Sequence, residues 1–493
     1  MKRFALAALA LGVLASGPAL AASGRDIVMQ GSKARALACS ACHGVQGAGQ
    51  PGAGIPRLAG LNATYLAHQL ASFASGARMN VTMTPIAKAL TKAERRAVAA
   101  YYARQKIKPA ATATLANIAS LAAGAALAMR GDWAKSVPGC SQCHGAKGEG
   151  VGATFPRLAG QAADYIAAQL KAWRAGTRHN DPMGLMAGIA KKLDADEIAS
   201  VAAYYAAFPK VPAPAPQTTA ATQAGFTPPP ESAIPKSDFG QMVRLGENVF
   251  RNTQKYAARY VGNTLNCQNC HLDAGRRAGS APLWAAFVSY PAYRSKNKHV
   301  NTYAERLQGC FRYSMNGRPP PPGSKVLVAL QAYSYFLARG APVGTDMKGR
   351  GYPAVKRPAK PFDYARGETV YRKSCALCHG ANGQGQKSAT GAPVFPALWG
   401  AHSFNWGAGM GNIKNAAAFI KANMPFSRAG TLTDQEAWDV AAFVDSRERP
   451  QDPRFTGSVA ETRKKFHNSA TWMYGLTVNG AVLGAYSPPS GRR

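Results

Sequence analysis

The sequence predicts an all-α protein of four tandem modules arranged as two halves, and three observations support this prediction. The motif Cys-x-x-Cys-His occurs four times, beginning at Cys39, Cys140, Cys267 and Cys375. The segment 56–78 recurs as 156–178, and each copy continues into a predicted helix that ends in Tyr-Tyr-Ala. The chain of 493 residues is longer than one compact domain, so each motif can belong to a module of its own.

The N-terminal segment 1–21 predicts a cleaved secretory signal. Two early charges, Lys2 and Arg3, precede an apolar stretch, and Ala19-Leu20-Ala21 forms a small-x-small cleavage site. No later stretch has the roughly 18 to 20 uncharged apolar residues that a membrane-spanning helix needs. We therefore expect export to the periplasm without a membrane span, and an uncleaved membrane anchor is the alternative.

The spacing within the motif indicates covalent c-type haem. Two thiols one helical turn apart can form thioethers with the two vinyl groups of one haem, and the adjacent His can ligate the iron. Zinc would need further Cys pairs, which the sequence lacks, and a disulfide framework would not need the His. We predict four covalently bound haems, attached through Cys39, Cys42, Cys140, Cys143, Cys267, Cys270, Cys375 and Cys378 and ligated by His43, His144, His271 and His379.

The repeat and a linker divide the chain into four cytochrome c-like domains, arranged as two di-haem halves. The linker is rich in Pro, Ala and Thr and has no helical period. Each domain is near the size that one haem can organise as a core. We predict a signal peptide at 1–21, cytochrome c domain 1 at 22–108, domain 2 at 109–208, the linker at 209–235, domain 3 at 236–358, domain 4 at 359–450 and a basic C-terminal tail at 451–493.

Each haem iron of the first half needs a sixth ligand, and Met is the best candidate. Met83 follows the first motif His, and Met186 follows the second at nearly the same separation in sequence. Both precede a repeated Ile-Ala-Lys by the same offset, so they align in the repeat. Met ligation raises the haem potential and suits electron transfer. Met79 and Met183 are the competing candidates, and a role as core filler is the other alternative.

The second half differs in the residue at the position expected for the sixth iron ligand, which we call the ligand slot. In domain 4, Met424 follows the motif His at a comparable separation and is preferred over Met410. In domain 3 the slot holds the ninth cysteine, Cys310, which follows His271 at nearly the separation of Met83 from His43. A thiolate bound to iron would be protected from oxidation and would lower the haem potential. Met315 is the rival ligand.

Basic residues outnumber acidic residues, with 59 Lys and Arg against 24 Asp and Glu and a formal charge of +35. Nucleic acid is not expected as a partner of an exported protein, so the charge favours an anionic substrate or an acidic redox protein. Six basic residues flank Cys310 in the sequence: Arg294, Lys296, Lys298, Arg306, Arg312 and Arg318. They form either a solvated surface or a clamp for a small oxyanion beside a reactive thiol.

Six motifs of the second half carry a resemblance to a known family. They are NCQNCHLDAGR (266–276), YPAYRS (290–295), RLQGCFRYSMNGRP (306–319), PVFPALWG (393–400), SFNWGAGM (403–410) and NMP (423–425). With them, residues 236–450 resemble the di-haem thiosulfate dehydrogenases. The first half is similar to the two-domain, di-haem class I cytochromes that serve as electron acceptors. The whole chain therefore resembles a natural fusion of the acceptor cytochrome with the dehydrogenase.

The resemblance implies roles for particular residues of the second half. It implies two ligand pairs, His271 with Cys310 and His379 with Met424. Arg306 and Ser314 would bind substrate beside Cys310, and Arg294 is a further candidate. Some relatives carry Lys immediately before the Met ligand of domain 4. This chain has Asn423 at that position, so a redox-driven exchange of Met for Lys is not expected.

The predicted reaction oxidises two thiosulfate ions to tetrathionate. Cys310 would leave the iron, form a thiosulfonate-type adduct and be regenerated when a second thiosulfate releases tetrathionate. Electrons would pass from domain 3 to domain 4, then to the first half and to an external cytochrome or other small redox protein. Direct oxidation of sulfur by the haem is the other mechanism. Tetrathionate reduction at the same site, a non-catalytic multihaem carrier and a di-haem peroxidase are the other candidate functions.

Overall fold

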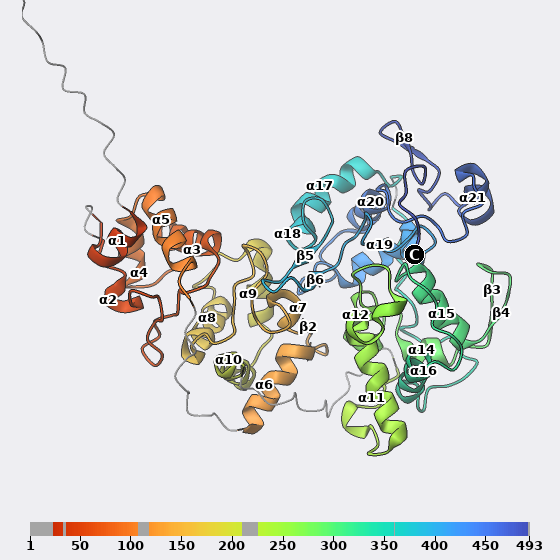
Figure 1. Cartoon of the computed structure of the whole chain (residues 1–493), viewed down its shortest axis with the longest axis horizontal. Coiled ribbons are helices and arrows are strands. Elements are labelled where there is room, and N and C mark those ends of the chain that lie inside the picture. The colour runs from red at the N-terminus through yellow and green to blue at the C-terminus, as the bar shows by residue number, and fades with distance from the viewer. Residues whose placement is uncertain (1–22, 33–35, 107–117, 210–224, 359, 492–493) are drawn as a thin grey trace, which may run out of the picture. The chain divides into compact units, whose positions relative to one another are not determined.

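The computed structural model describes residues 23–32, 36–106, 118–209, 225–358 and 360–491 (Figure 1). The chain divides into two compact units, Met1–Gly49 with Arg57–Ile107, and Gln50–Pro56 with Lys108–Arg493. In the described part of the chain no helix is long and apolar enough to cross a membrane. The predicted signal peptide and most of the predicted linker lie outside the described residues.

The first unit is a set of helices around one apolar core. Its helices are α1 (Gly24–Gln30), α2 (Ser40–His43), α3 (Ala63–Ser75), α4 (Met83–Lys88) and α5 (Lys92–Ala103). Asn62 caps α3 by accepting hydrogen bonds from two backbone N–H groups of its first turn. Thr91 and Glu94 form a capping box at the start of α5. The core contains Ile27 and Tyr102, which bring α1 and α5 together.

The second unit begins with a copy of this arrangement. The elements are α6 (Ile118–Arg130), β1 (Gly131–Asp132), β2 (Val137–Pro138), α7 (Ser141–His144), α8 (Ala163–Ala175), η1 (Pro182–Gly184), α9 (Leu185–Ala190) and α10 (Ala195–Ala207). Helix α8 has the same length as α3, and α10 begins with a capping box formed by Asp194 and Glu197. The sequence duplication is therefore a duplication of helices.

The third group of helices carries the ninth cysteine. The elements are η2 (Glu231–Ala233), α11 (Asp238–Arg251), α12 (Thr253–Tyr256), η3 (Ala258–Tyr260), η4 (Cys267–Asn269), α13 (Leu272–Gly275), α14 (Leu283–Phe287), β3 (Ala292–Arg294), β4 (His299–Asn301), α15 (Tyr303–Tyr313) and α16 (Lys325–Leu337). The antiparallel pair β3–β4 forms a hairpin in which Arg294 faces His299. This hairpin leads directly into α15, which a Thr302–Glu305 capping box begins.

The last group of helices is followed by a folded C-terminal segment. The elements are α17 (Tyr364–Ser374), α18 (Ala376–His379), β5 (Gln386–Lys387), β6 (Pro393–Phe395), η5 (Gly409–Gly411), α19 (Ile413–Asn423) and α20 (Asp434–Asp445), then α21 (Val459–Phe466), β7 (Thr477–Val478) and β8 (Ala481–Val482). Every sheet in the described residues consists of two antiparallel strands. The core is helical throughout, and the all-α prediction is confirmed.

One glycine marks a close helix crossing in each of the four groups. On Gly24 an added Cβ would lie 2.2 Å from the carbonyl oxygen of Ala97, where α1 meets α5. The equivalent pairs are Gly124 with Ser200 at 2.1 Å, Gly246 with Ala329 at 2.0 Å and Gly367 with Asp439 at 1.9 Å. Only glycine lets two helix backbones approach so closely. The same crossing of a first and a last helix is therefore built four times along the chain.

Candidate haem centres and the Cys310 site

The four Cys-x-x-Cys-His motifs have two backbone forms. In three of them a short helix, α2, α7 or α18, begins directly after the first cysteine. The third motif starts with the turn η4 and places His271 after it, with a φ of −108°. None of the nine cysteines forms a disulfide. Two free thiols one turn apart beside a histidine are what haem attachment requires.

Backbone carbonyl groups orient three of the motif histidines. The Nδ1 atoms lie 2.8 Å from the Pro156 oxygen in His144, 2.7 Å from the Ala281 oxygen in His271 and 3.0 Å from the Pro396 oxygen in His379. With the proton on Nδ1 donated to the carbonyl, Nε2 carries the lone pair that a metal ligand needs. The side chains therefore have the tautomer that suits an iron ligand.

Burial keeps these imidazoles neutral. It lowers the pKa of His144 and His379, and it lowers the pKa of His271 to about 4. His43 is buried as well, with 7% of its surface exposed. Because only the neutral imidazole can ligate iron, the residues present fit a c-type haem.

The Met residues expected as sixth ligands of the first two domains occupy comparable places. Met83 is the first residue of α4, whereas its rival Met79 is 71% exposed. Met186 of α9 and Cys140 both pack against the apolar core of domain 2. Its rival Met183 has a φ of 60° and lies outside that cluster. The geometry therefore favours Met83 and Met186, and their ligation stays a prediction.

In domain 4 the structure places Met424 directly after α19, with extended backbone. Met424 and Met410 both pack against a cluster formed by Trp133, Leu272 and Phe419, so packing alone does not separate the two candidates. The preceding Asn423 is only 3% exposed. Its Oδ1 accepts a hydrogen bond of 2.8 Å from Ser280, and its Nδ2 donates to the Phe419 carbonyl at 3.1 Å.

Cys310 lies on α15, one turn after Arg306. The Nη1 atom of Arg306 donates a hydrogen bond of 2.9 Å to the Cys310 sulfur. The negative charge of a Cys310 thiolate is the main cause of a raised pKa for Arg306. Burial, and then the charge of Cys310, also raises the pKa of Cys270 to about 12. Cys310 is therefore near the third haem-attachment motif and is paired with a guanidinium group.

Two of the other residues predicted for this site reach it in different ways. Ser314 follows α15 and lies one turn beyond Cys310, and its carbonyl accepts a hydrogen bond of 2.8 Å from Asn263. Arg294, on β3, donates to the Tyr290 hydroxyl at 2.5 Å. Tyr290 in turn contributes to the raised pKa of Arg306. Arg306 thus contacts Cys310 directly, whereas Arg294 is connected to the site through Tyr290.

The rival ligand Met315 lies in the apolar core of domain 3. It is 3% exposed and packs in the same cluster as Phe311 and Leu307. Its backbone groups are hydrogen-bonded, the N–H to the Cys310 carbonyl at 2.9 Å and the carbonyl to the Gly262 N–H at 2.9 Å. This packing gives Met315 a structural role and favours Cys310 as the ligand.

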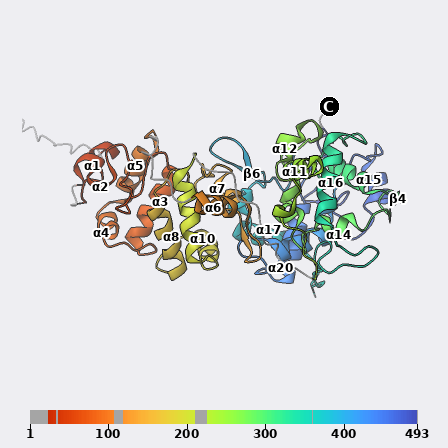
Figure 2. The ribbon, with the colours of Figure 1, turned by 90° about the horizontal axis from the view of Figure 1, so that it is seen from below.

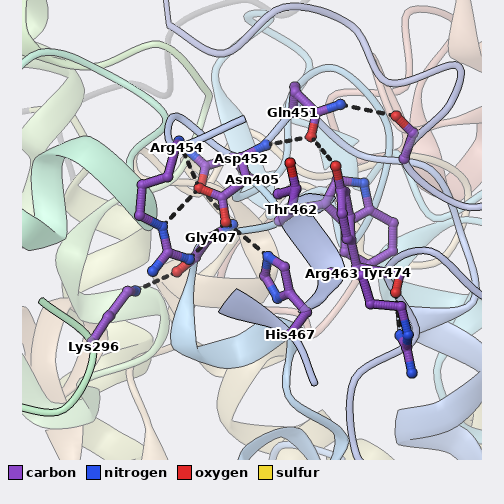
Figure 3. A network of polar contacts seen from close by, with 12 residues as sticks. Lys296, Asn405, Gly407, Gln451, Asp452, Arg454, Thr462, Arg463, His467 and Tyr474 are labelled. Atoms are coloured by element: carbon purple, nitrogen blue, oxygen red, sulfur yellow. Dashed lines mark hydrogen bonds and ion pairs between the residues drawn. The ribbon is translucent and has the colours of Figure 1, made fainter. Parts of the chain in front are cut away.

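The sequence analysis placed Lys296 among the basic residues around Cys310, but it missed Arg454, which the C-terminal segment brings to the end of α15. Lys296, after β3, lies with its Nζ 3.7 Å from the ring centroid of Tyr313. Arg454 lies 5.3 Å from the same ring and is bound to Asp452 (Figure 3). No local pattern connects residues so far apart in the sequence, and the basic composition of the tail was the only signal.

Domains 2 and 4 meet beside their haem-attachment motifs. The rings of Phe155 and Phe395 lie 5.1 Å apart in an apolar cluster, and Cys143 and Cys378 pack against it. A bridge between Val151 and Ser388 joins the two loops. Helix α7 and strand β6 lie side by side in both views (Figures 1 and 2). The two attachment sites are therefore neighbours.

Comparison with known proteins identifies the family. The chain is 62% identical to a thiosulfate dehydrogenase of Thiomonas intermedia over 271 residues, which cover 55% of this chain and 86% of the relative. The chain belongs to the thiosulfate dehydrogenase family. A solved member, thiosulfate dehydrogenase (TsdBA) from Marichromatium purpuratum, has the same fold, with a TM-score of 0.86 and 49% identity over 94% of this chain and 98% of that chain.

Other relatives match the cytochrome part of this chain. The chain is 48% identical over 195 residues to a thiosulfate dehydrogenase electron acceptor of Stutzerimonas stutzeri, covering 39% of this chain and 90% of the relative. The cytochrome c family matches residues 28–105 and 121–206, and the family described as cytochrome c oxidase, cbb3-type, subunit III matches 362–444. Cytochrome c domains bind haem covalently, so the chain carries c-type haem. The predicted resemblance to an acceptor–dehydrogenase fusion is confirmed.

Proposed function

We propose that this chain is a tetra-haem enzyme that oxidises two thiosulfate ions to one tetrathionate ion. The observation that carries the proposal is the hydrogen bond of 2.9 Å between Arg306 and the Cys310 sulfur. A guanidinium group at this place stabilises a thiolate and can also bind the oxygens of a dianion. An electron carrier without catalysis has no need of a thiolate paired in this way, so the contact favours an enzyme.

The proposed haem sites follow the four motifs. When bound, the haems supply one-electron acceptors that take up and conduct the two electrons of each turnover. The proposed ligand pairs are His43 with Met83, His144 with Met186, His271 with Cys310 and His379 with Met424. The buried Asn423, held by Ser280 and by its own helix, supports a domain 4 site in which no lysine replaces Met424.

Cys310 is the proposed nucleophile, and Arg306 holds it. The thiolate forms a bond with the terminal sulfur of the first thiosulfate, giving a Cys–S–S–sulfonate adduct with loss of two electrons to the bound haems. A second thiosulfate then attacks the sulfur atom next to Cys310. The new S–S bond makes tetrathionate, and the Cys310 thiolate leaves with the electron pair of the broken bond. Arg306, with Ser314 and Arg294 nearby, offsets the repulsion between the two anions.

The proposed electron route leads from domain 3 through domain 4 to the first half. The contact between Phe155 and Phe395, beside Cys143 and Cys378, supports transfer from the domain 4 haem to the domain 2 haem. An external redox protein, such as a small cytochrome, would receive the electrons in the periplasm. The strongly positive net charge favours an acidic partner and anionic substrates, and no nucleic acid is expected as a partner in that compartment.

Tetrathionate reduction is the second candidate function, since the same site catalyses both directions. Purified protein should be mixed with thiosulfate while haem absorption and tetrathionate are measured. We expect rapid haem reduction with one tetrathionate per two electrons, and an intact mass with four haem additions. Oxidised haems and no tetrathionate would contradict the proposal. Faster haem oxidation by tetrathionate than reduction by thiosulfate would favour the reductase.

A further inference from the structure

The C-terminal segment 451–491 packs on domain 4, where Tyr474 joins the core around Trp406, and its end also reaches domain 3. Near its end, the Gly491 N–H donates to Asn316 at 3.2 Å, directly after Met315. Ser487 accepts a hydrogen bond of 2.9 Å from the Trp406 indole. The segment also contains helix α21 and the hairpin β7–β8. Its contacts place it beside the loop that follows the Cys310 helix.

A buried ion cluster organises this segment. Asp452 is 1% exposed and accepts from the Nε and Nη2 atoms of Arg454 at 3.0 and 2.7 Å. The fully buried His467 donates from Nε2 to the same carboxylate at 2.8 Å (Figure 3). The rings of Trp472 and Tyr474 lie 4.5 and 4.7 Å from the imidazole. Because both carboxylate oxygens hold Arg454, its guanidinium group has one fixed position.

Arg454 and Lys296 both lie against Tyr313, which is the last residue of α15. The Cζ atom of Arg454 is 5.3 Å and the Nζ atom of Lys296 is 3.7 Å from the ring centroid. Lys296 also donates a hydrogen bond to the Gly407 carbonyl. On a helix, residues three and four apart share a face, so Tyr313 follows Arg306 and Cys310 on one side of α15. Lys296 is thus held one helical turn beyond the reactive sulfur.

The charges around Lys296 do not balance. Arg454, Arg306 and Arg294 all act on its ammonium group, whereas Asp452 is the opposing carboxylate. Burial, followed by the charges of Arg454 and Arg306, lowers the pKa of Lys296 to about 7. Four cations that face one carboxylate in a half-buried place repel one another. A bound dianion would relieve this repulsion, so the cluster is suited to an anion.

We propose that Lys296 binds the sulfonate group of the second thiosulfate, and that the C-terminal segment positions Lys296 for this task through Arg454 and Asp452. This inference rests on the proposed thiosulfate oxidation. In that reaction the second dianion must approach an adduct that already carries a sulfonate. Arg306 is occupied with Cys310 and the first thiosulfate, so a separate cation is needed for the second one. The ammonium group, fixed between the Tyr313 ring and the Gly407 carbonyl, supplies it.

The test compares Lys296→Met with Lys296→Arg in the full holoenzyme. Lys296→Met should raise KM for thiosulfate about tenfold or more, the effect of losing one charge-assisted hydrogen bond. Its kcat should fall much less, because Cys310 and Arg306 remain. Lys296→Arg should recover most of the affinity. The matched control is Lys464→Met, which removes the same charge from an exposed position of α21. It should leave KM unchanged.

The positioning role is tested with Asp452→Asn and Arg454→Gln. Both should raise KM with little change in kcat, and the absorption spectrum of the haems should stay that of the wild type. A KM within twofold of wild type for Lys296→Met would overturn the inference. An equal rise in KM for Lys464→Met would also overturn it, because it would indicate general electrostatic steering. A wild-type enzyme without thiosulfate oxidation would instead contradict the proposed function.

Discussion

Domains 2 and 3 share a helix crossing but differ at the ligand slot. In both, a glycine of the first helix, Gly124 or Gly246, touches the backbone of the last helix. In domain 2 the slot holds Met186, packed among apolar side chains. In domain 3 it holds Cys310, which accepts a hydrogen bond from Arg306. The comparison teaches that the same cytochrome c fold can carry two kinds of side chain at the proposed sixth-ligand position, a Met packed in an apolar core and a Cys paired with Arg.

The surroundings of the slot strengthen this contrast. Domain 3 has a hairpin, β3–β4, directly before α15, and that hairpin carries Arg294 at the end of β3 and Lys296 in its turn. The C-terminal segment adds Arg454, held by Asp452. In domain 2 the ligand helix α9 instead packs on α8 and the core. Positive charge is therefore gathered around Cys310, where the reaction is proposed.

The largest effect should come from removing the sulfur atom of the slot. Cys310→Gly should lower tetrathionate formation about 1,000-fold or more, because the nucleophile is lost. Product should be quantified after stopped reactions with excess thiosulfate and an artificial electron acceptor. Met186→Gly in domain 2 is the matched control, and it should retain thiosulfate oxidation with that acceptor. An equal loss of tetrathionate formation in the two variants would contradict the proposed division of roles between domains 2 and 3.

The second-largest loss of activity is expected at Arg306. Arg306→Gln should reduce kcat/KM for thiosulfate about 100-fold, since a partly buried charge-assisted hydrogen bond to Cys310 disappears. Arg312→Gln is the control, because that side chain lies on the same helix, close after Cys310 in sequence but on another face. Steady-state kinetics over a range of thiosulfate concentrations measure both. Loss of activity in the control alone would refute the assignment of Arg306.

The rate of electron transfer into the first half should depend on the sixth ligand of the domain 2 haem. Met186→His should lower the potential of that haem, because a nitrogen ligand replaces a thioether. Electrons should then reach the first half about tenfold more slowly, while turnover with a small artificial acceptor changes less than about twofold. Stopped-flow absorption separates the two processes. Met183→His is the control, and a spectral change in this variant with none in Met186→His would make Met183 the ligand.

The smallest effect concerns the C-terminal segment at acidic pH. Burial lowers the pKa of His467 below its ordinary value of 6.5, and its Nδ1 has no partner in the described structure. The folded segment therefore favours the neutral imidazole, so its stability is full above pH 6.5 and falls as the pH drops below that value. Limited proteolysis should cut the segment faster at pH 5 than at pH 8. His467→Gln should remove this difference, and its persistence would exclude His467 as the cause.

The sequence predicted the parts of the molecule that local patterns encode. The Cys-x-x-Cys-His motifs, the repeat and the ninth cysteine were visible because each is a short pattern, and the structure brings Arg306 to Cys310 because they are one helical turn apart. The glycine crossings were not visible, since Gly246 and Gly367 lie at different distances from their motifs. The link between Lys296 and Arg454 joins distant segments through the Tyr313 ring. Only the folded chain can show such a contact.

The most direct test of the account makes the domain 3 slot like that of domain 2. Cys310→Met keeps a sulfur ligand for the iron but removes the nucleophile, so it separates ligation from chemistry. Absorption spectra and tetrathionate yield should be measured on the same preparation. We predict a third haem with the spectrum of a His/Met pair and no tetrathionate formation. Near-normal turnover would show that Cys310 only tunes the iron, and an unchanged spectrum would make Met315 the ligand and contradict both roles of Cys310.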